Sequence, residues 1–187
     1  MSMKLVILGL LMENDSHPYQ MRQKMKERGM LHYIKMQEGS LYYAIDTLAK
    51  ADYVKAIETI KHSAGRPDRT VYRITESGRR LFQELLDKQF AENKAVYHPM
   101  YAALAFAKHG DPKRIHDLLQ GKLEEQRKLA ASLRELYDSH IDQVPRAVLH
   151  MMKGRLEHAE IELRWLERLA EDALNDRLKE YGKPIED

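Results

Sequence analysis

Histidines and carboxylates would have to supply any metal site or catalysis in this chain, because its 187 residues include nine histidines and no cysteine. No two histidines are four residues apart on an expected helix, and none lies near carboxylates at a recognisable ligand spacing. Without cysteine there is neither a disulfide nor a thiolate metal site. Phosphate-cradling loops and nucleophile-elbow motifs are missing from the sequence as well. The sequence therefore predicts no metal, no cofactor and no enzyme.

The side chains of residues 37–50 are better suited to contact with DNA than to catalysis or metal binding. If this segment is a helix, Leu41, Ile45 and Leu48 share one apolar stripe. The remaining surface then presents groups that can reach base edges or phosphates. Two arginines in a later turn-forming stretch could contact phosphates or the minor groove. The candidate DNA contacts are Gln37, Ser40, Tyr42, Tyr43, Thr47, Lys50, Arg66 and Arg69.

Several of these residues also have a purely structural interpretation. Tyr42 lies on the flank of the stripe and could pack against the core instead. Arg66 and Arg69 could be solvated charges on an exposed loop. Asp46 could accept a hydrogen bond from a cytosine amino group, but an ion pair with Lys50, four residues later, is the more common arrangement.

The elements that would position these residues follow a recognisable order. Helices are expected over residues 3–13, 18–28 and 37–51, and Gly29 provides a left-handed cap after the second. Residues 53–60 and 70–74 are rich in β-branched and aromatic residues, and a turn-forming stretch separates them. Three helices followed by a β-hairpin is the order of a winged helix-turn-helix, whose last helix enters the major groove of DNA.

Residues 3–90 resemble, motif by motif and in order, the PadR-type transcriptional regulators. The matching segments are Leu8–Leu11, His17–Tyr19, Gly39–Tyr42 with Ile45, Leu48 and Tyr53-Val54, Gly65–Pro67, and Tyr72–Thr75 with Gly78. Pro18 and Asp52 stand where that family usually has glycine, and Asp52 is expected to adopt the left-handed conformation. The resemblance implies a homodimeric repressor of palindromic operators, which in some members is released by a small aromatic or drug-like molecule.

The rest of the chain is helical by pattern, so the expected fold is mainly α. The winged helix is expected to occupy residues 1–90, and a helical dimerisation and effector domain residues 91–187. A helix capped by Thr75 should run to about Val96, so that the two domains share it. Further helices are expected from Pro112 to Asp138, and from Pro145 to about Tyr181.

The last of these helices carries an unbroken heptad seam that favours a coiled-coil dimer. The seam could also pack within its own chain. Trp165 lies off the seam, where it could widen an interface or line a cavity. The residues assigned to dimerisation are Leu149, Met152, Leu156, Leu163, Trp165 and Leu166. Tyr97, His98 and Tyr101 form a second local group, which could belong to an effector pocket or simply pack together.

Charge and hydropathy agree with a DNA-binding protein of the cytoplasm. The net charge is +2. Residues 1–88 have a balance of +4 and the remainder −2, which places the basic excess in the expected DNA-binding half. No apolar run approaches the ~20 residues of a membrane span, and the opening run from Leu5 to Met12 lacks the features of a signal peptide. The expected partners are double-stranded DNA, a second copy of the chain and a small effector. The alternative is a protein–protein adaptor that uses the winged helix as a docking surface.

Overall fold

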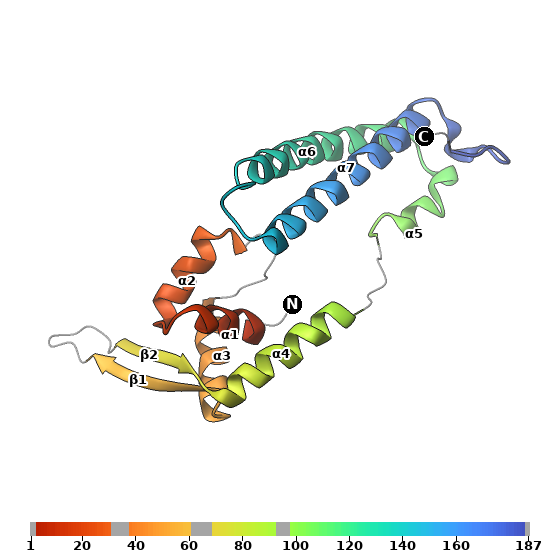
Figure 1. Ribbon diagram of the computed structural model, residues 1–187. Helices are drawn as coiled ribbons and strands as arrows, with labels where there is room; N and C mark the ends of the chain where they lie inside the picture. The colour runs from red at the N-terminus through yellow and green to blue at the C-terminus, as the bar shows by residue number, and fades with distance from the viewer. Residues whose placement is uncertain (1–2, 31–37, 61–68, 93–97, 186–187) are drawn as a thin grey trace, which may run out of the picture. The chain divides into compact units, whose positions relative to one another are not determined.

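The computed structural model describes residues 3–30, 38–60, 69–92 and 98–185. It divides into two compact units, Met1–Ala95 and Val96–Asp187 (Figure 1). The fold is mostly helical, with an antiparallel hairpin of two strands in the described part of the first unit. This confirms the mainly α fold and the winged helix-turn-helix order expected from the sequence.

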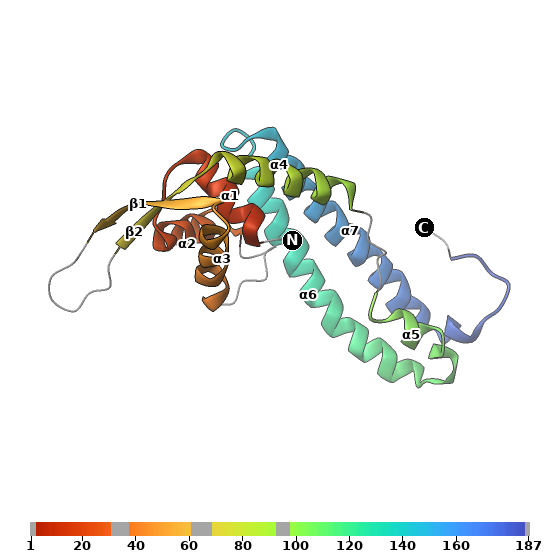
Figure 2. The same cartoon turned by 90° about the horizontal axis from the view of Figure 1, so that it is seen from below.

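The first unit contains the helices α1 (Met3–Glu13), α2 (Pro18–Glu27) and α3 (Glu38–Lys50), the strands β1 (Val54–Ile60) and β2 (Arg69–Ile74), and then α4 (Glu76–Ala91). The strands pair antiparallel from Val54 opposite Ile74 to Ile60 opposite Arg69. One irregularity in the register falls between Ala56 and Glu58. Figure 2 shows the hairpin projecting away from α1, α2 and α3.

The core of the first unit forms because each helix contributes apolar residues three or four positions apart. Residues of α1, α2, α3 and both strands make up one buried cluster: Ile7, Leu8, Leu10, Leu11, Met21, Met25, Leu41, Ala44, Ile45, Leu48, Val54 and Ile74. Leu81, Phe82 and Leu85 of α4 pack against it. The stripe predicted for α3 is therefore the face by which this helix is seated.

Local signals set the ends of these elements. His17 caps α2: its Nδ1 accepts a hydrogen bond from the Tyr19 amide, and Gln20 completes a capping box. Thr75 caps α4 by accepting from the Gly78 amide at 3.0 Å. Asp52 adopts a left-handed conformation with φ of 57°, as predicted.

The helix after Thr75 is shorter than predicted. α4 ends at Ala91, and Glu92 has an extended backbone, so the expected continuation to Val96 and the shared helix are wrong. The last turn buries no apolar side chain, since Phe90 is 86% exposed. A short extension would therefore gain little from packing, which supplies most helix stability in proteins.

The second unit is built on a helical hairpin. α6 (Pro112–Asp138) and α7 (Arg146–Leu174) lie side by side in both views (Figures 1 and 2). The short α5 (Tyr101–Leu104) and the 3₁₀ turns η2 (Ala107–His109) and η3 (Arg177–Lys179) flank them. Two buried clusters line the hairpin: Leu119, Leu123, Leu166, Leu169, Ala170 and Ala173 in one, and Ala130, Leu133, Leu156 and Ala159 in the other.

α7 also ends earlier than predicted, at Leu174 instead of near Tyr181. Asp176 is in the left-handed conformation with φ of 56°, which stops the helical path. The Asn175 side chain donates to the Glu171 carbonyl at 2.9 Å and so satisfies one of the last free carbonyls. Among the described residues, no helix is both long and apolar enough to cross a membrane.

Candidate nucleic-acid interface

The outer face of α3 presents two tyrosines to solvent. Tyr42 is 53% exposed and Tyr43 is 74% exposed, while Leu41, Ile45 and Leu48 behind them are buried. Ser40 is half-buried and Gly39 is exposed in the first turn. Since tyrosine offers an apolar ring and a hydroxyl, this face can make both stacking and hydrogen-bonding contacts.

The polar side chains toward the end of α3 bond to one another or to the backbone of the helix. Lys50 forms an ion pair with Asp46 at 2.7 Å, as the spacing predicted. The hydrogen bond from Lys50 to Asp46 raises the pKa of the Lys50 ammonium. Thr47 is half-buried, and its hydroxyl donates to the Tyr43 carbonyl at 2.8 Å. Asp46 thus acts as the ion-pair partner of a candidate phosphate contact.

Three predicted contacts lack a described side chain. Gln37 and Arg66 lie outside the described residues, and Arg69 is described only through its backbone, as the first residue of β2. Of the eight predicted DNA contacts, Ser40, Tyr42, Tyr43, Thr47 and Lys50 have described side chains, and α3 carries all five.

An ion pair that the sequence analysis missed joins the hairpin to the turn between α1 and α2. Arg73 donates from Nε and Nη2 to Asp15 Oδ2 at 2.9 Å and 2.5 Å. Ser16 and Tyr72 exchange backbone hydrogen bonds of 3.1 Å in both directions. The bonds from Arg73 lower the pKa of Asp15. These contacts set the direction of the hairpin relative to the helices of its unit.

The outer face of α2 adds residues that the sequence analysis did not select. Tyr19 is 62% exposed, and Arg22 and Lys26 are exposed on the same helix, while Met21 and Met25 are buried. The first helix of a helix-turn-helix commonly crosses the DNA backbone. The alternation of basic and buried apolar residues along α2 was the signal available in the sequence.

The predicted dimerisation residues fall into two groups. Met152, Leu156 and Leu166 are buried within the single chain. Leu149, Leu163 and Trp165 are half-buried, and the last two pack against the cluster that includes Leu166. Part of the heptad seam of α7 is therefore used to hold α7 against α6.

Two of the three residues suggested for an effector pocket lie together in the second unit. The His98 ring is 5.5 Å from that of Tyr101 and 4.8 Å from that of Trp165, measured between centroids. His98 Nε2 lies 3.0 Å from Glu162 Oε1. Tyr97 is outside the described residues. Among the described residues, no group of three or more histidines and carboxylates could hold a metal ion.

Comparison with known proteins gives a family match over most of the first unit. Residues 7–84 match the model of a family described as the transcriptional regulator PadR-like family. No curated protein sequence matches the chain.

Over at least 91% of its length the chain is similar in fold to several solved structures. Bacillus subtilis PadR in complex with operator DNA is 17% identical, with 91% of this chain and 98% of that one covered and a TM-score of 0.74. The same protein in complex with p-coumaric acid is 16% identical, with 91% and 97% covered and a TM-score of 0.76. The Vibrio cholerae virulence activator AphA is 19% identical, with 94% and 99% covered and a TM-score of 0.75.

Proposed function

Because residues 7–84 belong to the transcriptional regulator PadR-like family, we propose that this protein is a cytoplasmic repressor that binds a palindromic operator as a homodimer. The observation that carries the proposal is the surface of α3. There, two tyrosines are more than half exposed above a stripe of buried leucine and isoleucine. A helix seated in this way can enter the major groove while the core holds its other side.

The length of α3 fits this role. At 1.5 Å per residue, Ser40 and Lys50 are separated by ~15 Å along the helix, which compares with a major-groove width of ~12 Å. The first half of α3, with Ser40, Tyr42 and Tyr43, therefore reads base edges, and Lys50 meets a phosphate at the far end. A phosphate would compete with Asp46 for the Lys50 ammonium.

The hairpin acts as the wing. Arg66 and Arg69 contribute salt-dependent phosphate contacts, by the reasoning from the sequence. The Asp15–Arg73 ion pair and the backbone pairing of Ser16 with Tyr72 support this role, because they anchor the base of the hairpin.

A second chain pairs through the helical unit and supplies the other recognition helix. Leu149, Leu163 and Trp165 are half-covered within one chain, so these members of the predicted interface can still bury area against a partner. The two half-sites then lie about one helical turn (~10 bp) apart, or a multiple of that.

A small aromatic effector releases the DNA by favouring another spacing of the two recognition helices. The solved structure of Bacillus subtilis PadR with p-coumaric acid supports this class of ligand. The effector can act only through its different affinities for the two arrangements. The Vibrio cholerae protein is a virulence activator, so repression and activation are tested separately from DNA binding.

The test is fluorescence anisotropy of the full-length protein with duplex from its own promoter region, titrated with salt and with an unrelated duplex as competitor. Binding should saturate at two chains per site and weaken steeply with salt. Tyr43→Ala should weaken specific binding about tenfold. Lys50→Ala should weaken binding to both duplexes and reduce the salt slope by about one.

Matched controls lie elsewhere on the surface. Phe106→Ala removes an exposed aromatic ring of the second unit, and Lys88→Ala removes an exposed ammonium of α4. Neither should change DNA affinity. Equal affinity for promoter and competitor at low salt would reject the proposal and favour the adaptor. A promoter–reporter assay then separates repression from activation.

A further inference from the structure

Methionine is the side chain of this protein that peroxides oxidise most readily, because the chain has ten methionines and no cysteine. Among the described residues, Met12 is the most exposed of them, at 42%. It lies near the end of α1, whereas Met21 and Met25 of α2 are fully buried. A small oxidant in the solvent should therefore reach the sulfur of Met12 before those of the core.

The sulfur of Met12 contacts a side chain of α4. Arg79 of that helix donates a hydrogen bond from Nη1 to Met12 Sδ at 3.2 Å. The two helices also lie close together one turn earlier in α1, since a Cβ at Gly9 would lie 3.4 Å from Phe82 Cε2. An oxygen atom added to Met12 would therefore appear beside a guanidinium on the neighbouring helix.

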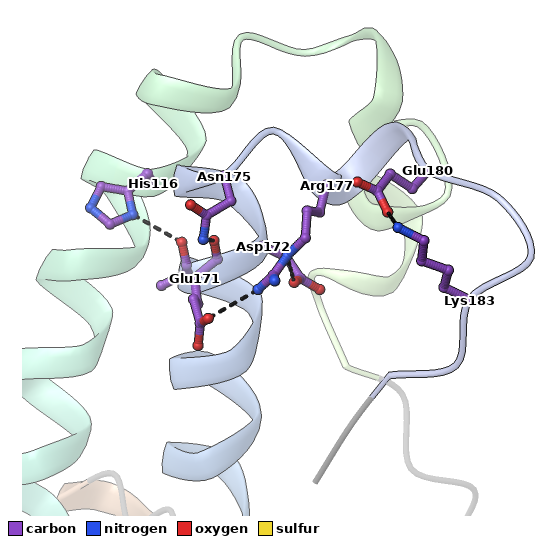
Figure 3. A network of polar contacts seen from close by, with 8 residues as sticks. His116, Glu171, Asp172, Asn175, Arg177, Glu180 and Lys183 are labelled. Carbon is purple, nitrogen blue, oxygen red and sulfur yellow. Dashed lines mark hydrogen bonds and ion pairs between the residues drawn. The ribbon is translucent and has the colours of Figure 1, made fainter.

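Arg79 differs from Arg73 and Arg177 in the kind of acceptor that it meets. Those two are bound to carboxylates, as Figure 3 shows for Arg177 after the end of α7. Arg79 has no carboxylate partner among the described residues, and the acceptor that it does have is a thioether. Because thioether sulfur is a weak acceptor, an oxygen atom at the same place would bind this guanidinium more strongly.

We propose that Met12 is a site of reversible oxidation by hydrogen peroxide, and that Arg79 binds the sulfoxide. A sulfur lone pair attacks one peroxide oxygen, an S–O bond forms, the O–O bond breaks and water leaves. Sulfur thereby loses two electrons and the peroxide gains them. Arg79 then exchanges its weak bond to sulfur for a stronger one to the sulfoxide oxygen. A methionine sulfoxide reductase, with a dithiol as the electron donor, returns the thioether and releases water.

Oxidation at this position has the opposite effect from oxidation in a core. Methionine sulfoxide commonly destabilises a protein, because it places a polar group among apolar side chains. Met12 is outside the buried cluster of the first unit, so its sulfoxide meets no such penalty. The new oxygen binds a residue of α4 instead, and the oxidised chain holds α1 against α4 more firmly. Neither Met12 nor Arg79 belongs to the predicted DNA contacts, so this modification does not rest on the proposed DNA binding.

Treatment of the full chain with dilute hydrogen peroxide, followed by trypsin digestion and mass spectrometry, tests the site without DNA. Trypsin releases residues 5–22 as one peptide, in which Met21 is an internal reference for Met12. Met12 should gain one oxygen atom at least about tenfold faster than Met21 in the folded protein, because exposure controls the reaction. In urea-unfolded protein the two rates should be equal. Equal rates in the folded protein overturn the proposal.

Two neighbouring exposed arginines of α4 form a matched pair of variants for the role of Arg79. Oxidation should lower the unfolding equilibrium constant about fivefold in the wild type and in Arg80→Ala, and should leave that of Arg79→Ala unchanged. Urea unfolding before and after peroxide treatment measures the change, and Met12→Leu, treated in the same way, corrects for oxidation at other methionines.

A methionine sulfoxide reductase should return the unfolding equilibrium constant of the oxidised wild type to its starting value. An equal effect of oxidation on the two arginine variants overturns the assignment of Arg79. Failure of the reductase to restore the starting value overturns the reversibility of the modification.

Discussion

Asp15 and Arg73 show how one pair of side chains joins segments 58 residues apart. The sequence analysis could not find this pair, because no spacing rule relates residues so distant. The Asp46–Lys50 ion pair and the positive φ of Asp52 were predicted, since each depends on geometry within a few residues. At this scale, prediction from the sequence succeeds for local contacts and fails for those that the fold creates.

The pair also makes stability depend on pH. The hydrogen bond from Arg73 lowers the pKa of Asp15 from its ordinary value of 3.8, so the ion pair stabilises the folded state at neutral pH. This contribution is lost as the pH falls through the lowered pKa. Asp15→Asn should therefore be less stable than the wild type at pH 7, and the difference should shrink as the pH falls below 3.8 and vanish below the lowered pKa of Asp15.

Urea unfolding at a series of pH values measures this difference. Glu84→Gln is the control, because Glu84 is an exposed carboxylate of α4 in the same unit. The free energy of unfolding of the Glu84→Gln variant should follow that of the wild type across the series. A constant gap between Asp15→Asn and the wild type from pH 7 to about pH 3 would contradict the assignment.

At the scale of elements, caps and apolar spacing predicted the order of helices and strands and most of their starts. The wrong boundaries were the ends of α4 and α7, which stop at Ala91 and Leu174. Neither helix is followed at once by glycine or proline, and the stop signal of Asn175 and Asp176 after α7 is weak because helices also tolerate these residues. The lack of packing against the last turn explains the end of α4, and the left-handed conformation of Asp176 explains the end of α7.

The contact between α4 and the start of β1 depends on a glycine. A Cβ at position 78 would overlap the Tyr53 carbonyl oxygen and lie 2.8 Å from Ile74 Cγ1. Gly78→Ala must therefore push β1 away from α4, which should cost about 1–3 kcal/mol. Thermal and urea unfolding would show a lower midpoint than that of the wild type.

A second glycine of the same unit provides the comparison. A Cβ at Gly39 in α3 would meet nothing within 4 Å. Gly39→Ala should leave the midpoint unchanged or raise stability by up to about 1 kcal/mol, since alanine favours the helix. If both variants unfold at the wild-type midpoint, the close approach at position 78 is not rigid.

At the scale of the whole molecule, the apolar heptad seam of α7 can serve two purposes: packing against α6 and pairing with a second chain. Leu156 and Leu166 are buried in clusters that α7 shares with α6, and Met152 is buried as well. Periodicity alone could not assign them, because an intrachain hairpin and a dimer need the same apolar spacing. The residues left partly open are the ones on which the proposed dimer depends.

Sedimentation equilibrium of the full chain should therefore report a dimer. Leu149→Asp places a charge at a half-covered position of α7 and should raise the dimer dissociation constant about tenfold or more. Leu118→Asp changes a 66% exposed leucine of α6 and should leave it unaltered. A monomeric wild type would refute the dimer, and equal dissociation constants would refute the assignment of Leu149.

The anchored base of the hairpin has a consequence for how operators could vary. Ser16 pairs with Tyr72 and Asp15 holds Arg73, so the base of the hairpin is tied to the turn between α1 and α2. In the proposed complex, the distance between a groove contact of α3 and the duplex at the base of the hairpin is then set by the protein. Where that distance differs from the spacing of the contacted groups on the DNA, the duplex must bend or its groove must narrow. The energy of this deformation depends on the base steps of the operator. Base pairs that no side chain touches would therefore contribute to operator choice through the flexibility of the DNA.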